Sequence, residues 1–175
     1  MKASAGGEAH VLPDVLGPGL RIVFCGTAAG SESARRAAYY AHPQNRFWRA
    51  LFEAGLTPRL LKPEDYLEAL QWGIGLTDIA KHASGMDREL PTGALGEAAC
   101  AALTAKIEAV QPKLLAFTSL AAGRRYLRRA AGFGDSGHRI GATRVWLLPS
   151  PSPTAGWNWP MHAHWWTKLA DAAQS

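Results

Sequence analysis

Residues 20–48, LRIVFCGTAAGSESARRAAYYAHPQNRFW, contain the stretch that decides the fold. A nearly continuous apolar run, Leu20 followed by Ile22 to Cys25, predicts a strand buried on both faces, as in a parallel sheet covered by helices. The strand runs directly into a loop of small residues, Gly26 to Gly30, which a ligand could approach closely. Open α/β sheets tend to bind ligands at this end of a strand. A plain tight turn is the alternative, because such a loop alone is a weak signal.

Length and composition indicate a single globular domain. The chain has 175 residues, of which 47% are hydrophobic and 19% charged. It contains no run of about 18 apolar residues, and its opening lacks a continuous apolar stretch, so we expect a cytoplasmic protein without a signal peptide or membrane segment. Cys25 and Cys100 lack CxxC spacing. We therefore expect two reduced core thiols, no metal site and no cofactor.

The charge balance is moderately basic. Nineteen Lys and Arg residues against fourteen Asp and Glu residues give a net charge of +5. Several arginines are clustered, namely Arg35/Arg36, Arg124/Arg125, Arg128/Arg129 and Arg139/Arg144. A basic surface suits a polyanionic partner such as a nucleic acid, because neutralising phosphates releases counterions. A solvated arginine-rich face is the other interpretation.

Predicted helices and strands alternate along the rest of the chain. Residues 1–19 form a predicted loose lead-in, with Val15 and Leu16 packing near the first strand, and 20–175 form the single domain. The predicted strands are 20–25, 73–79, 113–118 and 143–148, and an exposed loop covers 81–91. The predicted helices are 31–38 capped by Ser31 or Ser33, 47–54, 63–71 with Tyr66, Leu67 and Leu70 inward, 95–110, 121–131, and 162–172 packing through Trp165, Trp166 and Leu169. This order predicts an α/β fold, a single-domain three-layer sandwich with a mainly parallel central sheet flanked by helices.

A second candidate loop follows the last predicted strand. Residues 149–155 read PSPSPTA, with three prolines at alternate positions. Proline removes backbone donors and restricts the backbone, so the segment can hold a protruding shape. We expect this loop and the Gly26 to Gly30 loop at the same edge of the sheet.

Five segments resemble the mismatch-specific uracil and thymine DNA glycosylases, a branch of the uracil-DNA glycosylase superfamily. They are VFCGTAAG (23–30), YYAHPQNRFW (39–48), GLTDIAKHASGMDREL (75–90), LLPSPSPTA (147–155) and HWWTKL (164–169). The resemblance covers nearly the whole chain after Gly19, and AHPxNRFW is its most specific part. It implies a uracil-DNA glycosylase-like fold and hydrolysis of the N-glycosidic bond of a flipped uracil in a G·U mismatch, or of other damaged pyrimidines, which initiates base excision repair. The implied partner is mismatched double-stranded DNA, with single strands as the alternative, and we expect a monomer.

The resemblance also implies roles for individual residues. Base binding falls to Gly26, Thr27, Ala28, Gly30 and Tyr40, with Tyr40 stacking on the flipped ring or, alternatively, serving as a core aromatic beside Tyr39. DNA contacts fall to Ser31, Ser33 and Lys81, and to a minor-groove wedge of Ser152, Pro153, Thr154 and Ala155. Trp157 or Trp159 could add apolar surface to the wedge. His42 and Asn45 would brace the pocket loop.

Ala28 departs from the family pattern. Many members carry an Asn here that orients the attacking water, and alanine cannot hold water. A carboxylate near the sugar could stabilise the oxocarbenium-like state and position or deprotonate water. We select Asp78, at the end of the GLTD strand, before Glu32; the alternative is that Asp78 caps a turn or pairs with Lys81 or Arg88. Ser150 would donate a hydrogen bond to the leaving base.

Two other functions remain open at this stage. A neighbouring branch, the hypoxanthine-DNA glycosylases, shares YYAHPxNxFW and a PSxSP loop, and Ala28 with Ala29 would give room for a purine. A non-catalytic binder of damaged DNA would equally explain Ala28 and the basic helix. An inosine-containing substrate separates the first from a uracil enzyme, and binding without base release would identify the second.

Overall fold

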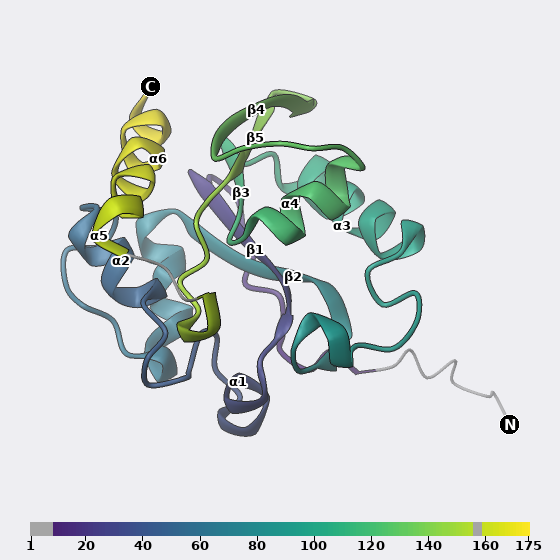
Figure 1. Cartoon of the computed structure of the whole chain (residues 1–175). Coiled ribbons are helices and arrows are strands. Elements are labelled where there is room, and N and C mark those ends of the chain that lie inside the picture. The colour runs from purple at the N-terminus through teal and green to yellow at the C-terminus, as the bar shows by residue number, and fades with distance from the viewer. Residues whose placement is uncertain (1–8, 156–158) are drawn as a thin grey trace, which may run out of the picture.

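The computed structural model describes residues 9–155 and 159–175. Its core is a five-stranded sheet in the order β2-β1-β3-β5-β4 (Figure 1). The strands are β1 (Ile22–Ala29), β2 (Ile74–Ser84), β3 (Leu114–Phe117), β4 (Gly134–Ile140) and β5 (Thr143–Leu147). β1 pairs in parallel with β2 and β3, β3 pairs in parallel with β5, and β4 is antiparallel to β5. This mainly parallel sheet agrees with the predicted fold class.

Helices cover both faces of the sheet (Figure 1). On one face lie α2 (Phe47–Glu53) and α6 (His164–Gln174), preceded by the short α5 (Trp159–His162). On the other lie α3 (Glu97–Val110) and α4 (Leu120–Leu127). The remaining elements are α1 (Ser31–Arg36) and three 3-10 segments, η1 (Pro63–Trp72), η2 (Asp87–Glu89) and η3 (Pro153–Ala155).

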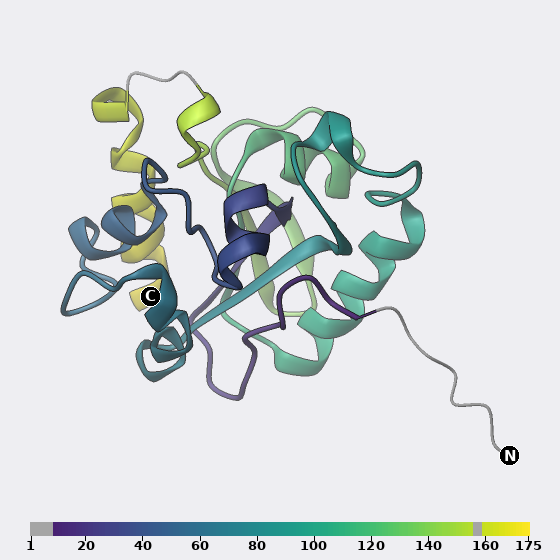
Figure 2. The same ribbon diagram turned by 90° about the horizontal axis from the view of Figure 1, so that it is seen from below.

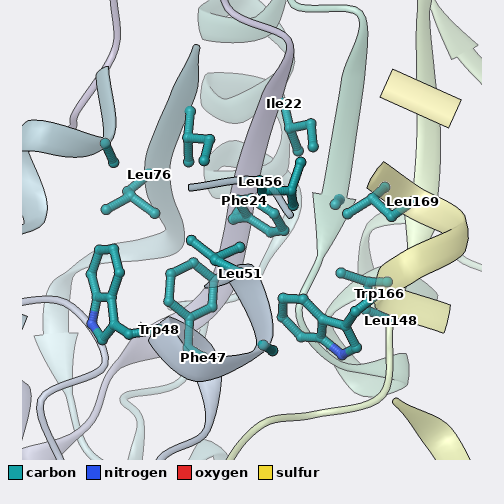
Figure 3. Close-up of a cluster of buried hydrophobic side chains, with 14 of the residues drawn as sticks. Ile22, Phe24, Phe47, Trp48, Leu51, Leu56, Leu76, Leu148, Trp166 and Leu169 are labelled. Atoms are coloured by element: carbon teal, nitrogen blue, oxygen red, sulfur yellow. The ribbon is translucent and has the colours of Figure 1, made fainter. Parts of the chain in front are cut away.

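Alternate side chains of β1 build the two halves of the core. Ile22 and Phe24 belong to the cluster that includes residues of α2 and α6, while Val23 and Cys25 belong to the cluster with residues of α3 and α4. Figure 3 shows the first cluster, where the Phe24 ring packs against Phe47 with centroids 5.2 Å apart. Burial on both faces is what the apolar run of the first strand predicts, and it explains why a helical layer lies on each side.

Two segments that were predicted to be loops are strand in the structure. Gly26 to Ala29 are not a loop but the last part of β1, paired with β2 up to a bulge between Ala28 and Ala29. β2 likewise continues to Ser84, so the start of the expected exposed loop 81–91 is strand. Ladder hydrogen bonds form between backbones, so small and polar residues extend a strand when a neighbouring strand is there to pair with.

The structure corrects three further predictions about the elements. β4 was missed because GDSGHRI lacks apolar alternation; it forms as the antiparallel edge beside β5. In η1, Tyr66 packs against the core as predicted, but Leu67 and Leu70 are 59% and 37% exposed and Ala69 is buried instead. The C-terminal helix is divided into α5 and α6, although Trp166 and Leu169 are buried as predicted.

The described part of the lead-in, from residue 9, packs against the sheet. Leu12 and Val15 are buried, and Val15 exchanges two backbone hydrogen bonds of 2.9 Å with Leu76 in β2. The segment is therefore held more firmly than the predicted loose lead-in; residues 1–8 lie outside the described part. No helix among the described residues is long and apolar enough to span a membrane.

Candidate functional site

A cavity of about 590 Å³ opens where β1, β2 and β3 end, bounded by α1, η2 and the loop after β5. These segments lie on the side of the molecule turned toward the viewer in Figure 2. The cavity is lined by almost every residue that the sequence assigns to a site. They are Gly26, Thr27, Ala28, Gly30, Ser31, Ser33, Tyr40, His42, Asn45, Asp78, Ser150, Ser152, Pro153 and Thr154. Lys81 and Ala155 do not line it. The position agrees with the general rule for ligands on open α/β sheets.

Asp78 provides the buried acid of the cavity. It lies within β2, not at its end as predicted, directly opposite Gly26 of β1, and is only 6% exposed. A Cβ at position 26 would lie 2.7 Å from Asp78 Oδ1, closer than carbon and oxygen can approach without a shift. Glycine at position 26 therefore makes the space in which the Asp78 carboxyl lies.

Burial raises the pKa of Asp78 to about 7, because the charged form loses hydration. The positive charge of Lys81 acts in the opposite direction, and so does a hydrogen bond from the Gly26 backbone, while Asp14 raises the pKa further. At neutral pH the ionised and protonated forms of Asp78 are then present in comparable amounts. A carboxyl group in this condition can exchange a proton with a reactant at little cost.

Lys81 is buried and lies outside the cavity, which argues against its predicted contact with DNA. It is 6% exposed, its Nζ lies 3.1 Å from Asp14 Oδ1, and it donates a 3.0 Å hydrogen bond to Tyr39 Oη. Asp14 also pairs with Lys106 Nζ at 2.7 Å and accepts a hydrogen bond from Thr77. Burial of a charge requires such a partner, so the pair of Lys81 is Asp14 and not Asp78.

Tyr40 forms a wall of the cavity. Its backbone is left-handed (φ 52°), its ring stacks on Phe47 with centroids 3.8 Å apart, and its Oη lies 3.2 Å from Thr118 Oγ1. Burial raises the pKa of Tyr40, so its hydroxyl stays protonated. The ring of Tyr40 packs on a core aromatic and also lines the cavity, so the structure is compatible both with a core role and with stacking on a base. Stacking on a base stays a prediction.

The segment 42–47 is held by local hydrogen bonds of its own side chains. Asn45 Oδ1 accepts a hydrogen bond of 2.9 Å from the Phe47 backbone, and His42 Nδ1 accepts one from the Gln44 backbone. The Arg46 backbone N–H donates to the Pro151 carbonyl at 3.0 Å, which ties this segment to the Pro-Ser loop.

The Pro-Ser loop is further stabilised by its own hydroxyls. Ser150 Oγ accepts a hydrogen bond from the Ser152 backbone at 3.2 Å, and Ser152 Oγ lies 2.9 Å from Thr154 Oγ1. Pro153 to Ala155 form the short η3 turn. Trp157 lies outside the described residues. Trp159 is buried beneath Arg46 and so is not an exposed wedge, which corrects that expectation.

The polar residues of α1 differ in their exposure and in their hydrogen-bond partners. Gly30, not a serine, occupies the N-cap position. Ser33 is buried and its Oγ accepts a hydrogen bond from the Ala41 backbone, which suits bracing rather than the predicted phosphate contact. Ser31 is exposed at the rim of the cavity. Glu32 forms an ion pair with Arg35 at 2.8 Å, which lowers the pKa of that carboxyl and leaves Asp78 as the better candidate acid.

Sequence reasoning missed several residues that line the cavity, among them Thr118 and Asp87. Thr118, at the end of β3, lies beside Tyr40 and donates to the Cys25 carbonyl at 3.4 Å. Asp87 accepts a hydrogen bond of 2.6 Å from Thr27 Oγ1 and so connects η2 to β1. Thr118 could have been found from its place after a predicted strand, because parallel strands end at one edge of the sheet. Within residues 9–155 and 159–175 no group of three His, Cys, Asp or Glu side chains is arranged to hold a metal ion.

Gly26→Ala tests the importance of the space at residue 26. The added methyl group must displace the Asp78 carboxyl, and we expect catalysis to fall by about 10²-fold if that carboxyl takes part, since general acid–base groups contribute this much or more. Single-turnover base release measures the effect. Gly30→Ala is the matched control, because Gly30 lines the same cavity, has extended backbone and has nothing within 4 Å of the added Cβ. Equal rates for both variants would contradict the expectation.

Fold and site together define a class: an α/β protein whose pocket, at the carboxyl ends of parallel strands, contains one buried carboxyl group that titrates near neutrality. Residues 13–170 match the model of the Uracil DNA glycosylase superfamily, and the chain belongs to this family. Membership supports a DNA glycosylase activity, with DNA as the partner.

The fold is shared with a solved structure from the archaeon Methanosarcina acetivorans. This solution NMR structure is described as a “putative Uracil DNA glycosylase”. The two chains superpose with a TM-score of 0.62 at 21% sequence identity, and the match covers 94% of this chain and 98% of the other. At this level of identity the likeness concerns the fold.

Proposed function

We propose that this protein is a monofunctional uracil-DNA glycosylase that hydrolyses the N-glycosidic bond of a uracil flipped out of a G·U mismatch. The observation that carries the proposal is the position of Asp78, a buried carboxyl group in the wall of the cavity formed by the family's own motif segments. An enzyme that acts on a base in a duplex must extrude it, at a cost of a few kcal/mol that is lowest for mispairs. The cavity of about 590 Å³ offers enough space for such a base.

Ionised Asp78 would act on water and on the sugar. The water oxygen forms a bond to C1′ while the bond from C1′ to the base nitrogen breaks, and that nitrogen keeps the electron pair. The water proton passes to Asp78 and then to solvent. The negative carboxylate also stabilises the positive charge that develops on the sugar ring in an oxocarbenium-like state. Ala28 lines the same cavity as Asp78 but has no polar group to hold this water, so the task would fall to the Asp78 carboxylate.

Ser150 would stabilise the leaving base. Its Oγ accepts a hydrogen bond from the Ser152 backbone, so its own proton is available for a carbonyl oxygen of uracil. The departing uracil carries negative charge, and a donor aimed at that charge lowers the barrier.

The Pro-Ser loop would support extrusion. Ser152, Pro153, Thr154 and Ala155 form a stiff tip at the rim, which would fill the space left by the flipped nucleotide. Ser31 would contact a phosphate beside it. No lysine lines the cavity in the described part of the chain, which supports base removal without strand cleavage through a lysine adduct.

Hypoxanthine is the second candidate base. Ala28 is small and the cavity is roomy for a pyrimidine, which favours acceptance of a purine as well. The same cavity and the same acid would then serve a larger leaving group.

The test is base release in single turnover from a panel of oligonucleotides. The panel contains uracil opposite guanine, opposite adenine and in a single strand, thymine opposite guanine, and hypoxanthine opposite thymine. We expect uracil opposite guanine to be released fastest, since a mispair costs least to open. Release of hypoxanthine alone would replace the first proposal with the second, and tight binding without release of any base would contradict both.

A further inference from the structure

A second cavity, of about 380 Å³, is lined by residues of α3 and α4 and of the segment before α3. These two helices cover one face of the sheet (Figure 1). On the α4 side it is lined by Ala121, Arg124, Arg125 and Arg128, and on the α3 side by Gly96 and Cys100. Ala121 lines both cavities, so the two are neighbours on the surface. We call the second one the arginine cavity.

The arginines follow one face of α4 away from the candidate active site. Positions 121, 124, 125 and 128 are spaced i, i+3, i+4 and i+7, which places them on the same side of a helix. Ala121 is at the end nearest the cavity of Asp78, and Arg128 is at the far end of α4. Seven residues of helix rise about 10 Å, which matches about three base-pair steps along a DNA strand.

The charge of the arginine cavity is positive and accessible. Arg124, Arg125 and Arg128 are all exposed, and the carboxylate among the lining residues is Glu97. Arg128 lies 3.7 Å from Glu97, but both side chains are largely exposed, so this ion pair is weak and can be exchanged for another anion. Arg124 donates its Nε–H to the Ala131 carbonyl, which holds that side chain along the helix end.

We propose that the arginine cavity binds backbone phosphates of the DNA strand that leads away from the flipped nucleotide. This inference rests on the proposed function, because it takes the Asp78 cavity as the place of that nucleotide. Arginine matches phosphate in geometry as well as in charge, and phosphate contacts set the register of a protein on DNA without reading its sequence. The arginine cavity would then add affinity for the duplex beside the flipped nucleotide and take no part in the chemistry at Asp78.

The test compares two double variants with equal loss of charge. Arg125→Gln/Arg128→Gln alters the arginine cavity, whereas Arg49→Gln/Arg129→Gln removes two exposed arginines that line neither cavity. The affinity for an undamaged duplex of about 20 base pairs is measured over a series of salt concentrations. We expect the first variant to weaken binding about tenfold at low salt and to reduce the salt slope by about two, one per lost phosphate contact, and the second to change the slope by less than about half a unit.

A second readout separates phosphate binding from a structural effect. At saturating enzyme, single-turnover base release by Arg125→Gln/Arg128→Gln is expected to equal that of the wild type, because the chemistry at Asp78 is intact. An unchanged salt slope, or equal losses in both double variants, would overturn the inference even where base release is normal. Failure of the wild type to release any base, with the slopes still different, would instead remove the proposed function and leave a DNA-binding surface.

Discussion

Asp78→Asn is expected to slow base release from a G·U duplex by about 10³-fold in single turnover, within the range that a general acid–base group contributes. Asparagine keeps the size of the side chain but can neither take a proton from water nor stabilise positive charge on the sugar. Asp78→Ala should be slowed at least as much. The matched control is Glu32→Gln, because Glu32 lines the same cavity but is held in an ion pair with Arg35.

The pH dependence of the wild type follows from the same carboxyl group. Since the pKa of Asp78 is about 7 and the ionised form is the active one, the rate should fall about tenfold for each pH unit below that value and level off above it. The residual rate of Asp78→Asn should lack this dependence. Release at nearly the wild-type rate by both Asp78→Asn and Asp78→Ala would remove Asp78 from the mechanism.

Asp78→Asn is also expected to stabilise the protein against unfolding at neutral and alkaline pH. The pKa of Asp78 is raised from 3.8 to about 7 on folding, so the folded state holds this proton more tightly than the unfolded state. The contribution of this proton to the free energy of unfolding is complete below about pH 4 and is lost as the pH rises to about 7. The asparagine side chain does not titrate, so the Asp78→Asn variant escapes this loss. A shift of about three pKa units sets an upper limit of about 4 kcal/mol on the gain.

Urea unfolding at about pH 5 and pH 8 measures this effect. We expect the difference in the free energy of unfolding between Asp78→Asn and wild type to be larger at the higher pH, with a gain of several degrees in Tm there. Other titrating groups are common to both proteins and cancel in the difference. A difference that does not change with pH would contradict the assigned burial of the charge. A variant that is more stable but inactive is the usual sign of a group kept for function.

Much of the architecture was predictable from local sequence. The apolar run of Leu20 and Ile22 to Cys25 requires cover on both faces, and the alternation of predicted strands and helices supplies it as a parallel sheet between two helical layers. The motif segments could be assigned to one edge of that sheet because parallel strands all end there, and the cavity contains them.

The edge strand β4 and the burial of polar side chains could not be predicted from local sequence. The strand β4 has no apolar alternation and forms only because β5 offers it hydrogen-bonding partners. Lys81 was expected in an exposed polar loop, yet it lies in β2, and Asp14, far away in the chain, supplies the partner that allows its burial. Ser33 likewise faces inward because the Ala41 backbone needs an acceptor.

The sequence by itself determined the two-sided burial of the first strand, since hydrophobic periodicity is a local property of the chain, and its motif segments, through their family resemblance, indicated most of the residues that line the cavity. Only the tertiary structure decided what those residues can do. Burial in the folded chain raises the pKa of Asp78 to about 7 although Lys81 and the Gly26 backbone act in the opposite direction, and the arginines of α4 line a cavity together with residues of α3. Dielectric environment and the distance between charges depend on residues that are remote in sequence, so they exist only once the chain is folded.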